Sequence, residues 1–207
     1  MKKILVTQRM EYLPDYGEKR DSIDQKWTEF LISIDLLPVF ISNNQIHLEA
    51  IIKNEEIHGA ILTGGGNLVK YGGEFPERDQ IETNILEWAI KNDKAILGVC
   101  RGMQLIQDYF DIPIERISNH VGIRHQLQAN KGLKLTNLIE DFSDVNSFHN
   151  YGTTQSANPL NISAFSNDGI VMALEHSENN IYGIMWHPER EKSFMLEDKK
   201  LFRRVFR

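Results

Sequence analysis

The only cysteine of the chain, Cys100, lies in a sequence typical of a catalytic nucleophile. It stands within Gly98-Val99-Cys100-Arg101-Gly102, after an apolar run predicted as a buried strand and before a predicted helix. A Gly-x-nucleophile-x-Gly turn holds its central side chain clear of the sheet, and small neighbours avoid clashes around the strained backbone. The helix N-terminus favours the thiolate over the thiol. Taken alone, the residue has a second interpretation, as a small buried hydrophobic side chain.

A cysteine nucleophile needs a base, and the base needs an orienting group. Of the seven histidines, His187 directly follows a predicted strand, in Trp186-His187-Pro188-Glu189. Residues i and i+2 of an extended chain point to the same side, so Glu189 is placed to hold one tautomer of His187. Pro188 restricts the backbone between them. An ordinary histidine in a surface loop is the alternative interpretation of this spacing.

Three consecutive glycines follow another predicted strand, in Thr63-Gly64-Gly65-Gly66-Asn67. Such a loop exposes backbone N–H groups to a ligand. It lacks the Gly-Lys-Ser/Thr ending of a P-loop and the spacing of a dinucleotide fingerprint. The N–H groups of Gly64 or Gly65 are therefore candidates for an oxyanion hole, together with the N–H of Arg101. A tight turn without function is the alternative.

The elements that must position these residues follow an α/β pattern, in which short apolar runs alternate with segments of helical periodicity. In the first half, strands are predicted at residues 3–7, 39–41, 60–62 and 95–99, and helices at residues 22–37, 46–52, 78–91 and 102–110. Pro38 is expected to end the first helix, and Tyr109 to face inward on the last.

The second half has a different pattern, with successive strands and no helix between them. Strands are predicted at residues 133–135, 162–165, 171–174 and 181–185, followed by a helix at residues 192–206. Strands in succession indicate an antiparallel extension of a parallel sheet. The expectation is one α/β domain over residues 1–207, with a mostly parallel central sheet flanked by helices.

Composition excludes several classes of function. The chain has 207 residues, 41% hydrophobic and 25% charged, which is ordinary for a globular domain. Its formal net charge of −6 argues against nucleic-acid binding, and it has no stretch suited to a membrane. A single cysteine excludes an intrachain disulfide. The apolar run after Met1 is too short for a signal peptide, so a cytoplasmic protein is expected.

Together, the glycine loop, Gly-Val-Cys-Arg-Gly-Met-Gln and Trp-His-Pro-Glu resemble the class I glutamine amidotransferases and their γ-glutamyl hydrolase relatives, across most of the chain. The resemblance implies a flavodoxin-like core, with Cys100 as nucleophile, His187 as base and Glu189 as orienting carboxylate. It implies oxyanion donors at Gly64, Gly65 and Arg101. It also implies that the glutamyl group is bound by Gln104 and by the segment that contains Ser147, Phe148 and His149.

The residues Cys-Arg-Gly resemble the γ-glutamyl hydrolase branch, in which a histidine-containing loop, here with His120 and His125, lies beside the site. Gln8-Arg9, residues 16–25 with Arg20, and residues 147–152 resemble small amidotransferase-type proteins of bacterial capsule gene clusters. This resemblance implies a nucleotide-linked γ-glutamyl conjugate as substrate. The candidate cations for its phosphates are Arg9, Arg20, Lys70, Arg101 and Arg124, with Arg101 the best placed because it adjoins Cys100.

The predicted activity is hydrolysis of a γ-glutamyl amide-type bond through a γ-glutamyl thioester, which releases glutamate. This chemistry requires no metal and no organic cofactor, and the expected ligand is a small molecule. Three alternatives stay open: a glutaminase subunit that passes ammonia to a separate synthetase, a hydrolase of γ-glutamyl amines or peptides, and a non-catalytic binding domain on the same fold.

Overall fold

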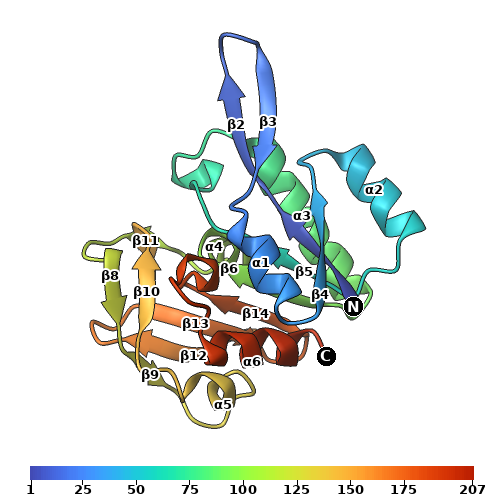
Figure 1. Cartoon of the computed structure of the whole chain (residues 1–207). Helices are drawn as coiled ribbons and strands as arrows, with labels where there is room; N and C mark the ends of the chain where they lie inside the picture. Colours follow the sequence, from blue (N-terminus) through green and yellow to red (C-terminus); the bar gives the residue numbers. More distant parts are fainter.

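The computed structural model describes residues 1–207 and is built on one eight-stranded sheet. Its strands lie in the order β4 (Leu36–Ile41), β1 (Lys2–Thr7), β5 (Gly59–Leu62), β6 (Ala95–Val99), β14 (Ile181–Ile184), β13 (Val171–His176), β12 (Leu160–Ser166) and β9 (Leu127–Ala129). The strands from β4 to β14 pair in parallel, and those from β14 to β9 pair antiparallel. The predicted mostly parallel sheet with an antiparallel extension is confirmed (Figure 1).

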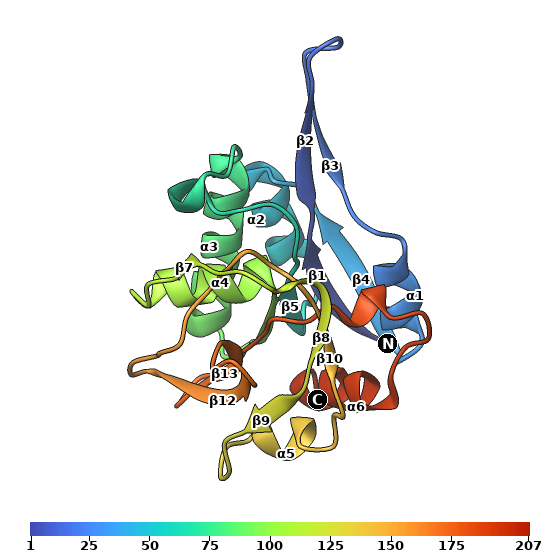
Figure 2. The same ribbon diagram turned by 90° about the vertical axis from the view of Figure 1, so that its left-hand side faces the viewer.

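Helices cover both faces of this sheet, as Figure 2 shows. One layer holds α2 (Gln45–Asn54), α3 (Pro76–Lys91) and α4 (Arg101–Tyr109), and the other holds α1 (Lys26–Ile32) and α6 (Leu196–Val205), with α5 (Thr136–Ile139) packed against α6. A single cluster of 45 buried hydrophobic residues joins the sheet to both layers, so the chain is one domain. None of the helices combines the length and the apolar character needed to cross a membrane.

Three small antiparallel pairs lie outside the main sheet. They are β2 (Arg9–Leu13) with β3 (Glu18–Ser22), β8 (Val121–His125) with β10 (Val145–Phe148), and β7 (Glu115–Arg116) with β11 (Tyr151–Gly152). The β2–β3 hairpin projects from the domain as a long ribbon (Figure 1). No strand is predicted from the sequence for β2 or β3. The hairpin is largely charged and exposed, and it lacks the apolar alternation that marks a half-buried strand.

The first helix is shorter than predicted. Its buried side chains Trp27 and Phe30 lie within α1, but Asp35 adopts a left-handed backbone with φ 64°, and the chain then enters β4. Ser22, at the predicted start of the helix, lies in β3 instead. Pro38 lies inside β4 and does not end the helix. β4 pairs on one side only, and an edge strand tolerates the missing N–H of proline.

Three further predictions were wrong in detail. Residues 133–135 form no strand, because the backbone N–H groups of Lys134 and Leu135 donate to the buried carboxylate of Glu175, at 3.0 and 2.5 Å, and α5 begins directly afterwards. The last helix begins at Leu196, not at residue 192. Tyr109, expected to face inward, is 38% exposed at the end of α4.

The carboxyl ends of β1, β5, β6 and β14 meet at one edge of the sheet, because these strands run in parallel. A buried carboxylate, Glu82 of α3, joins the chain at that edge. Its Oε1 accepts hydrogen bonds from Thr7 Oγ1 at 2.8 Å and from Arg78 Nε at 3.0 Å, and its Oε2 pairs with the guanidinium of Arg101. Thr63 then joins β5 to β1, since its N–H donates to Thr7 Oγ1 at 2.9 Å.

The charges of this buried cluster depend on one another. Burial opposes ionisation of Glu82, but the charges of Arg101 and Arg78 outweigh it and hold the pKa of Glu82 below its ordinary value. Burial lowers the pKa of Arg78 to about 10, despite the opposing charge of Glu82, so both groups stay ionised at neutral pH. The cluster thereby fastens α3 to the start of α4 and to the ends of β1 and β5.

Replacing Glu82 by glutamine leaves two buried guanidinium groups without their shared carboxylate. We expect Glu82→Gln to lower the free energy of unfolding by about 3 kcal/mol, measured by urea denaturation. The exposed pair between Lys3 and Glu55 offers a matched control. Glu55→Gln should cost at most about 1 kcal/mol, and an equal loss in the two variants would contradict this role of Glu82.

Candidate active site

Cys100 occupies a strained turn between β6 and α4. Its backbone has φ 54° and ψ −104°, a conformation that non-glycine residues rarely adopt, and its N–H donates to the carbonyl of Ile184 at 2.8 Å. Both flanking glycines are sterically required. A Cβ on Gly98 would lie 2.5 Å from the backbone carbon of Gly102, and one on Gly102 would lie 2.1 Å from the carbonyl oxygen of Leu62. The predicted elbow is therefore present.

His187 follows the end of β14 and is held from two directions. Its Nδ1 lies 2.7 Å from Glu189 Oε1, so the expected pairing of these side chains is present. Its backbone N–H donates to Asn146 Oδ1 at 2.8 Å, and its carbonyl accepts from Asn146 Nδ2 at 2.8 Å. With Nδ1 bonded to Glu189, the nitrogen left for Cys100 is Nε2, which is buried and has no other partner.

The cysteine and histidine stabilise each other's charged forms. Burial opposes the thiolate, but the charge of the neighbouring His187 outweighs it and lowers the pKa of Cys100. Burial would also lower the pKa of His187, yet Cys100 and the hydrogen bond to Glu189 raise it to about 9. The geometry therefore favours a thiolate–imidazolium pair at neutral pH.

The glycine loop lies directly against this pair. A Cβ on Gly64 would lie 2.6 Å from His187 Cε1 and 3.3 Å from Cys100 Cβ, so no larger residue fits there. The guanidinium of Arg78 binds the loop from behind, through the carbonyls of Gly65 at 2.6 Å and of Gly64 at 3.2 Å. The N–H groups of Gly64 and Gly65 make no hydrogen bond within the protein, which leaves them available to a ligand.

A pocket of about 150 Å³ opens over Cys100. Its wall is formed by the glycine loop, α4 and the segment after β10, and it is lined by Gly65, Gly66, Asn67, Cys100, Gln104, Phe148, His149, Asn150, His187 and Arg190. A second pocket of about 250 Å³ shares the glycine loop and extends to Arg9, Met10 and residues 72–75. The larger cavity of about 670 Å³ lies elsewhere, at the amino ends of β1 and β6, and contains no residue of this site.

The residues that the sequence predicted for the glutamyl group lie close together. Gln104, Phe148 and His149 line the pocket, and Gln104 Nε2 donates to the carbonyl of Tyr151 at 3.0 Å. The ring of Phe148 stands edge-on to His187, with the centroids 5.9 Å apart. Ser147 is buried behind them, where its hydroxyl donates to the carbonyl of His120 at 2.8 Å. Their contact with substrate stays a prediction.

Two predicted histidines lie outside the pocket wall. His120 is buried behind His149, with its Nδ1 3.2 Å from His149 Nε2, and His125 stacks on the ring of His120. Neither lines the pocket over Cys100, so their direct contact with substrate also stays a prediction.

Most of the predicted phosphate-binding cations are already paired. The expectation that Arg101 is the best placed is wrong, because its guanidinium is buried and pairs with Glu82 and Asp79, while its backbone lies beside Cys100. Three others form ion pairs away from the pocket: Arg20 with Glu18 on the projecting hairpin, Lys70 with Asp108, and Arg124 with Asp144 and Glu191. Arg9 differs, since its side chain lies along Gly65 and makes no ion pair.

Four residues that position the site or line its pocket were not predicted from the sequence. Arg190 directly follows the Trp-His-Pro-Glu motif, lines the pocket and lies over the Phe148 ring, 4.6 Å from its centroid. Its place next to Glu189 was a signal that could have identified it. Asn146 lies within the segment singled out for the glutamyl group, but the sequence holds no sign that it binds the backbone of His187. Arg78 and Glu82 gave only the i, i+4 spacing of an ordinary surface ion pair.

Comparisons with known proteins agree with this fold and show the family. The model of the Peptidase C26 family matches residues 4–189. A γ-glutamyl-CDP-amidate hydrolase from Campylobacter jejuni is 31% identical over 194 residues, which covers 90% of this chain and 89% of that protein. The glutamine-hydrolysing GMP synthase subunit of Methanococcus vannielii is 29% identical and covers 74% of this chain and 75% of that protein.

Among solved structures, a protein of Thermoplasma acidophilum described as a GMP synthase subunit superposes with a TM-score of 0.75. The match covers 100% of this chain and 92% of that protein at 16% identity, so this likeness shows the fold. The family match extends over the strand ends and loops that contain Cys100, the glycine loop, His187 and Glu189. The chain is thus a member of the Peptidase C26 family, within the class I glutamine amidotransferase-like proteins.

Proposed function

We propose that this protein is a cysteine-dependent hydrolase of a γ-glutamyl amide-type bond, with γ-glutamyl-CDP-amidate as its substrate and Cys100, His187 and Glu189 as its catalytic residues. One observation carries the proposal. Cys100 is held on a strained turn against the free Nε2 of His187, whose Nδ1 is bonded to Glu189. This arrangement of thiol, imidazole and carboxylate supports the roles of nucleophile, base and orienting group in acyl transfer.

In the first half of the reaction, the sulfur of Cys100 adds to the γ-carbonyl carbon, and the electron pair of the C=O bond moves to its oxygen. The N–H groups of Gly64 or Gly65 and of Arg101 bind that oxyanion, and one such donor contributes about 3 kcal/mol in acyl-transfer sites. The C–N bond then breaks, and the departing nitrogen takes the proton from His187 Nε2. The product of this half is a γ-glutamyl thioester on Cys100.

In the second half, a water molecule gives a proton to His187 Nε2 and adds to the thioester carbonyl. The C–S bond breaks, glutamate leaves, and the thiolate–imidazolium pair is restored. Glu189 keeps Nδ1 bonded throughout, so that Nε2 faces the reacting atoms in both halves. With the proposed substrate, the two products are cytidine diphosphoramidate and glutamate.

The substrate is proposed from two supports. The first is the similarity to the γ-glutamyl-CDP-amidate hydrolase, which extends over nine-tenths of both proteins. The second is the pair of arginines at the pocket: Arg9 lies along the glycine loop, and Arg190 stands over Phe148. Guanidinium groups at the pocket suit the phosphates of a nucleotide leaving group. We extend the proposal to the modification of capsular polysaccharide, as the resemblance to proteins of capsule gene clusters implies.

A glutamate-release assay on the isolated protein tests the proposal. We expect fast release from γ-glutamyl-CDP-amidate, slow release from glutamine and from a γ-glutamyl amine, and none from the Cys100→Ala variant. Release from glutamine alone, increased by a separate synthetase, would instead favour a glutaminase function like that of the glutamine-hydrolysing GMP synthase relative. Release from γ-glutamyl amines alone would make those the substrate. No release from any of the three would favour a binding domain.

The charge state of Cys100 gives a second prediction. Because the pKa of Cys100 is lowered, the thiolate is present above that lowered value, and alkylation by iodoacetamide should reach its maximum at a lower pH than for an ordinary thiol. In His187→Ala, burial remains without its counter-charge, and the pKa of the thiol should rise. Alkylation at pH 7 should then fall by roughly tenfold or more and recover only at high pH. His47→Ala, remote from the site, should keep the wild-type profile.

The two arginines provide a third test. Arg9→Ala and Arg190→Ala should each raise the KM for γ-glutamyl-CDP-amidate by roughly tenfold, as expected for one lost charge-assisted hydrogen bond. The rate with a γ-glutamyl amine, which has no phosphate, should change little for Arg9→Ala. Arg203→Ala on the remote face of α6 is the control. Equal losses with both substrates in Arg9→Ala would contradict phosphate binding by that residue.

A further inference from the structure

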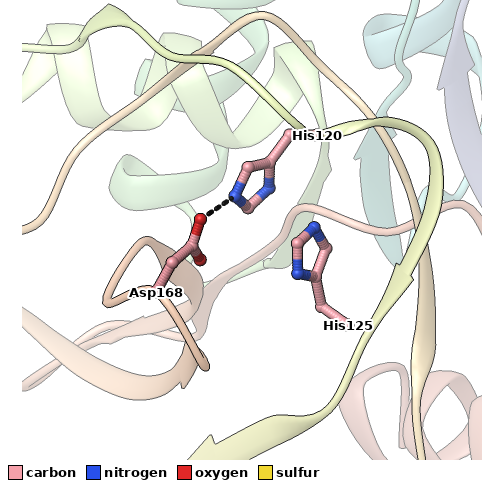
Figure 3. Close-up of side chains that lie close together, drawn as sticks. All are labelled: His120, His125 and Asp168. Carbon is pink, nitrogen blue, oxygen red and sulfur yellow. Dashed lines mark hydrogen bonds and ion pairs between the residues drawn. The ribbon is translucent and has the colours of Figure 1, made fainter.

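Two histidines of one segment and an aspartate of another come together behind the pocket wall. His120 precedes β8, His125 ends it, and Asp168 lies in the turn between β12 and β13. Figure 3 shows His125 beside His120, with both rings across from Asp168. One ligand atom from each residue lies within 4.8 Å of the other two, and His120 Nε2 is 3.0 Å from Asp168 Oδ2. The catalytic steps derived above use none of these three side chains.

The hydrogen bonds around His120 determine where its protons lie. The carbonyl oxygen of Tyr151, 2.9 Å from His149 Nδ1, only accepts, so that nitrogen carries a proton. The neutral ring of His149 then has its lone pair on Nε2. That lone pair is 3.2 Å from His120 Nδ1, which must therefore donate to it.

The consequence is an unmatched contact on the other side of the ring. A neutral His120 with its proton on Nδ1 presents a lone pair at Nε2, and this lone pair faces a carboxylate oxygen of Asp168 at 3.0 Å. Two acceptors at that distance repel each other unless a cation lies between them. The cation is either a second proton on His120 or a metal ion.

The position of His125 favours a metal ion over a second proton on His120. A proton between His120 and Asp168 would leave His125 unused, although its ring is stacked on His120 with the centroids 4.0 Å apart and its Nε2 is buried without a hydrogen-bond partner. It would also place an imidazolium against two further buried or half-buried imidazoles, His125 and His149. A divalent ion would use both imidazoles and the carboxylate together.

We propose that His120, His125 and Asp168 bind one divalent transition-metal ion, of which Zn²⁺ is the best match. Two imidazoles and one carboxylate form a donor set typical of zinc, with water in the remaining position. The bond from His120 Nδ1 to His149 is the outer-shell contact that metal-bound histidines require. The side chain of Asp168 is 51% exposed, which gives an ion access from solvent.

The proposed ion has a structural role and takes no part in the hydrolysis. It would join the β8 strand to the β12–β13 turn and brace His120, on which His149 of the pocket wall rests. Binding should therefore raise the melting temperature, because the ion binds the folded arrangement of two segments that are distant in sequence.

The test uses zinc binding by the full chain in a Cys100→Ser background, which removes the thiol as a competing ligand. After treatment with a chelator, the protein is titrated with Zn²⁺ against a chromophoric chelator, and the melting temperature is recorded in parallel. We expect one equivalent of zinc and a raised melting temperature. Adding Asp168→Asn or His125→Gln should weaken binding by roughly tenfold or more and abolish the thermal shift. His47→Gln, a histidine outside the cluster, should change neither.

Cobalt gives an independent readout in the protein with its natural cysteine. Co²⁺ at the proposed site should show the spectrum of nitrogen and oxygen ligands without a thiolate charge-transfer band, and Asp168→Asn should abolish that spectrum. Zinc binding unchanged by both substitutions would overturn the proposal. So would its absence from the Cys100→Ser protein, in which case nitrogen NMR should find His120 doubly protonated. Because no γ-glutamyl substrate is used, these outcomes are independent of the hydrolase proposal.

Discussion

The site depends on the buried carboxylate of Glu82 and the two guanidinium groups that share it. Arg101 directly follows Cys100, and Arg78 binds the carbonyls of the glycine loop, so one carboxylate anchors both the turn at Cys100 and the loop opposite it. Burial of Glu82, Arg78 and Arg101 removes three charges from water, and the cost is offset only because each charge is paired. The same pairing orients the glycine peptides, whose carbonyls are held from behind and whose N–H groups are left free.

This anchoring explains how Cys100 can keep a strained backbone and how its buried thiol can favour the charged form. The turn has an unfavourable φ, and the thiolate is opposed by burial, so both must be held by the surrounding structure. The imidazole supplies the counter-charge, and its position is set by Glu189 on the ring and Asn146 on the backbone. The parallel strands contribute by bringing Cys100, the glycine loop and His187 to one edge of the sheet.

The basic side chains considered for phosphate binding fall into two groups, those that already form ion pairs within the protein and those that do not. Arg20, Lys70, Arg101 and Arg124 all have carboxylate partners, whereas Arg9 has none and Arg190 has only a distant contact of 3.8 Å with Glu189. A side chain that is already paired within the protein contributes little to the binding of a ligand. The phosphate contacts are therefore proposed at Arg9 and Arg190. Behind the opposite wall, the two histidines predicted to contact substrate form a group with Asp168.

The sequence by itself determined the strands of the parallel sheet, the glycine-flanked turn at Cys100 and the contact of Glu189 with His187. Each depends on a local pattern: buried apolar runs, flanking glycines and i, i+2 spacing. It failed for the β2–β3 hairpin and for residues 133–135, where cross-strand pairing and a distant carboxylate decide the backbone. Only the tertiary structure decided which arginines are free, that Asn146 holds His187, and that His120, His125 and Asp168 meet. Those contacts join residues far apart in the chain, and no local pattern records them.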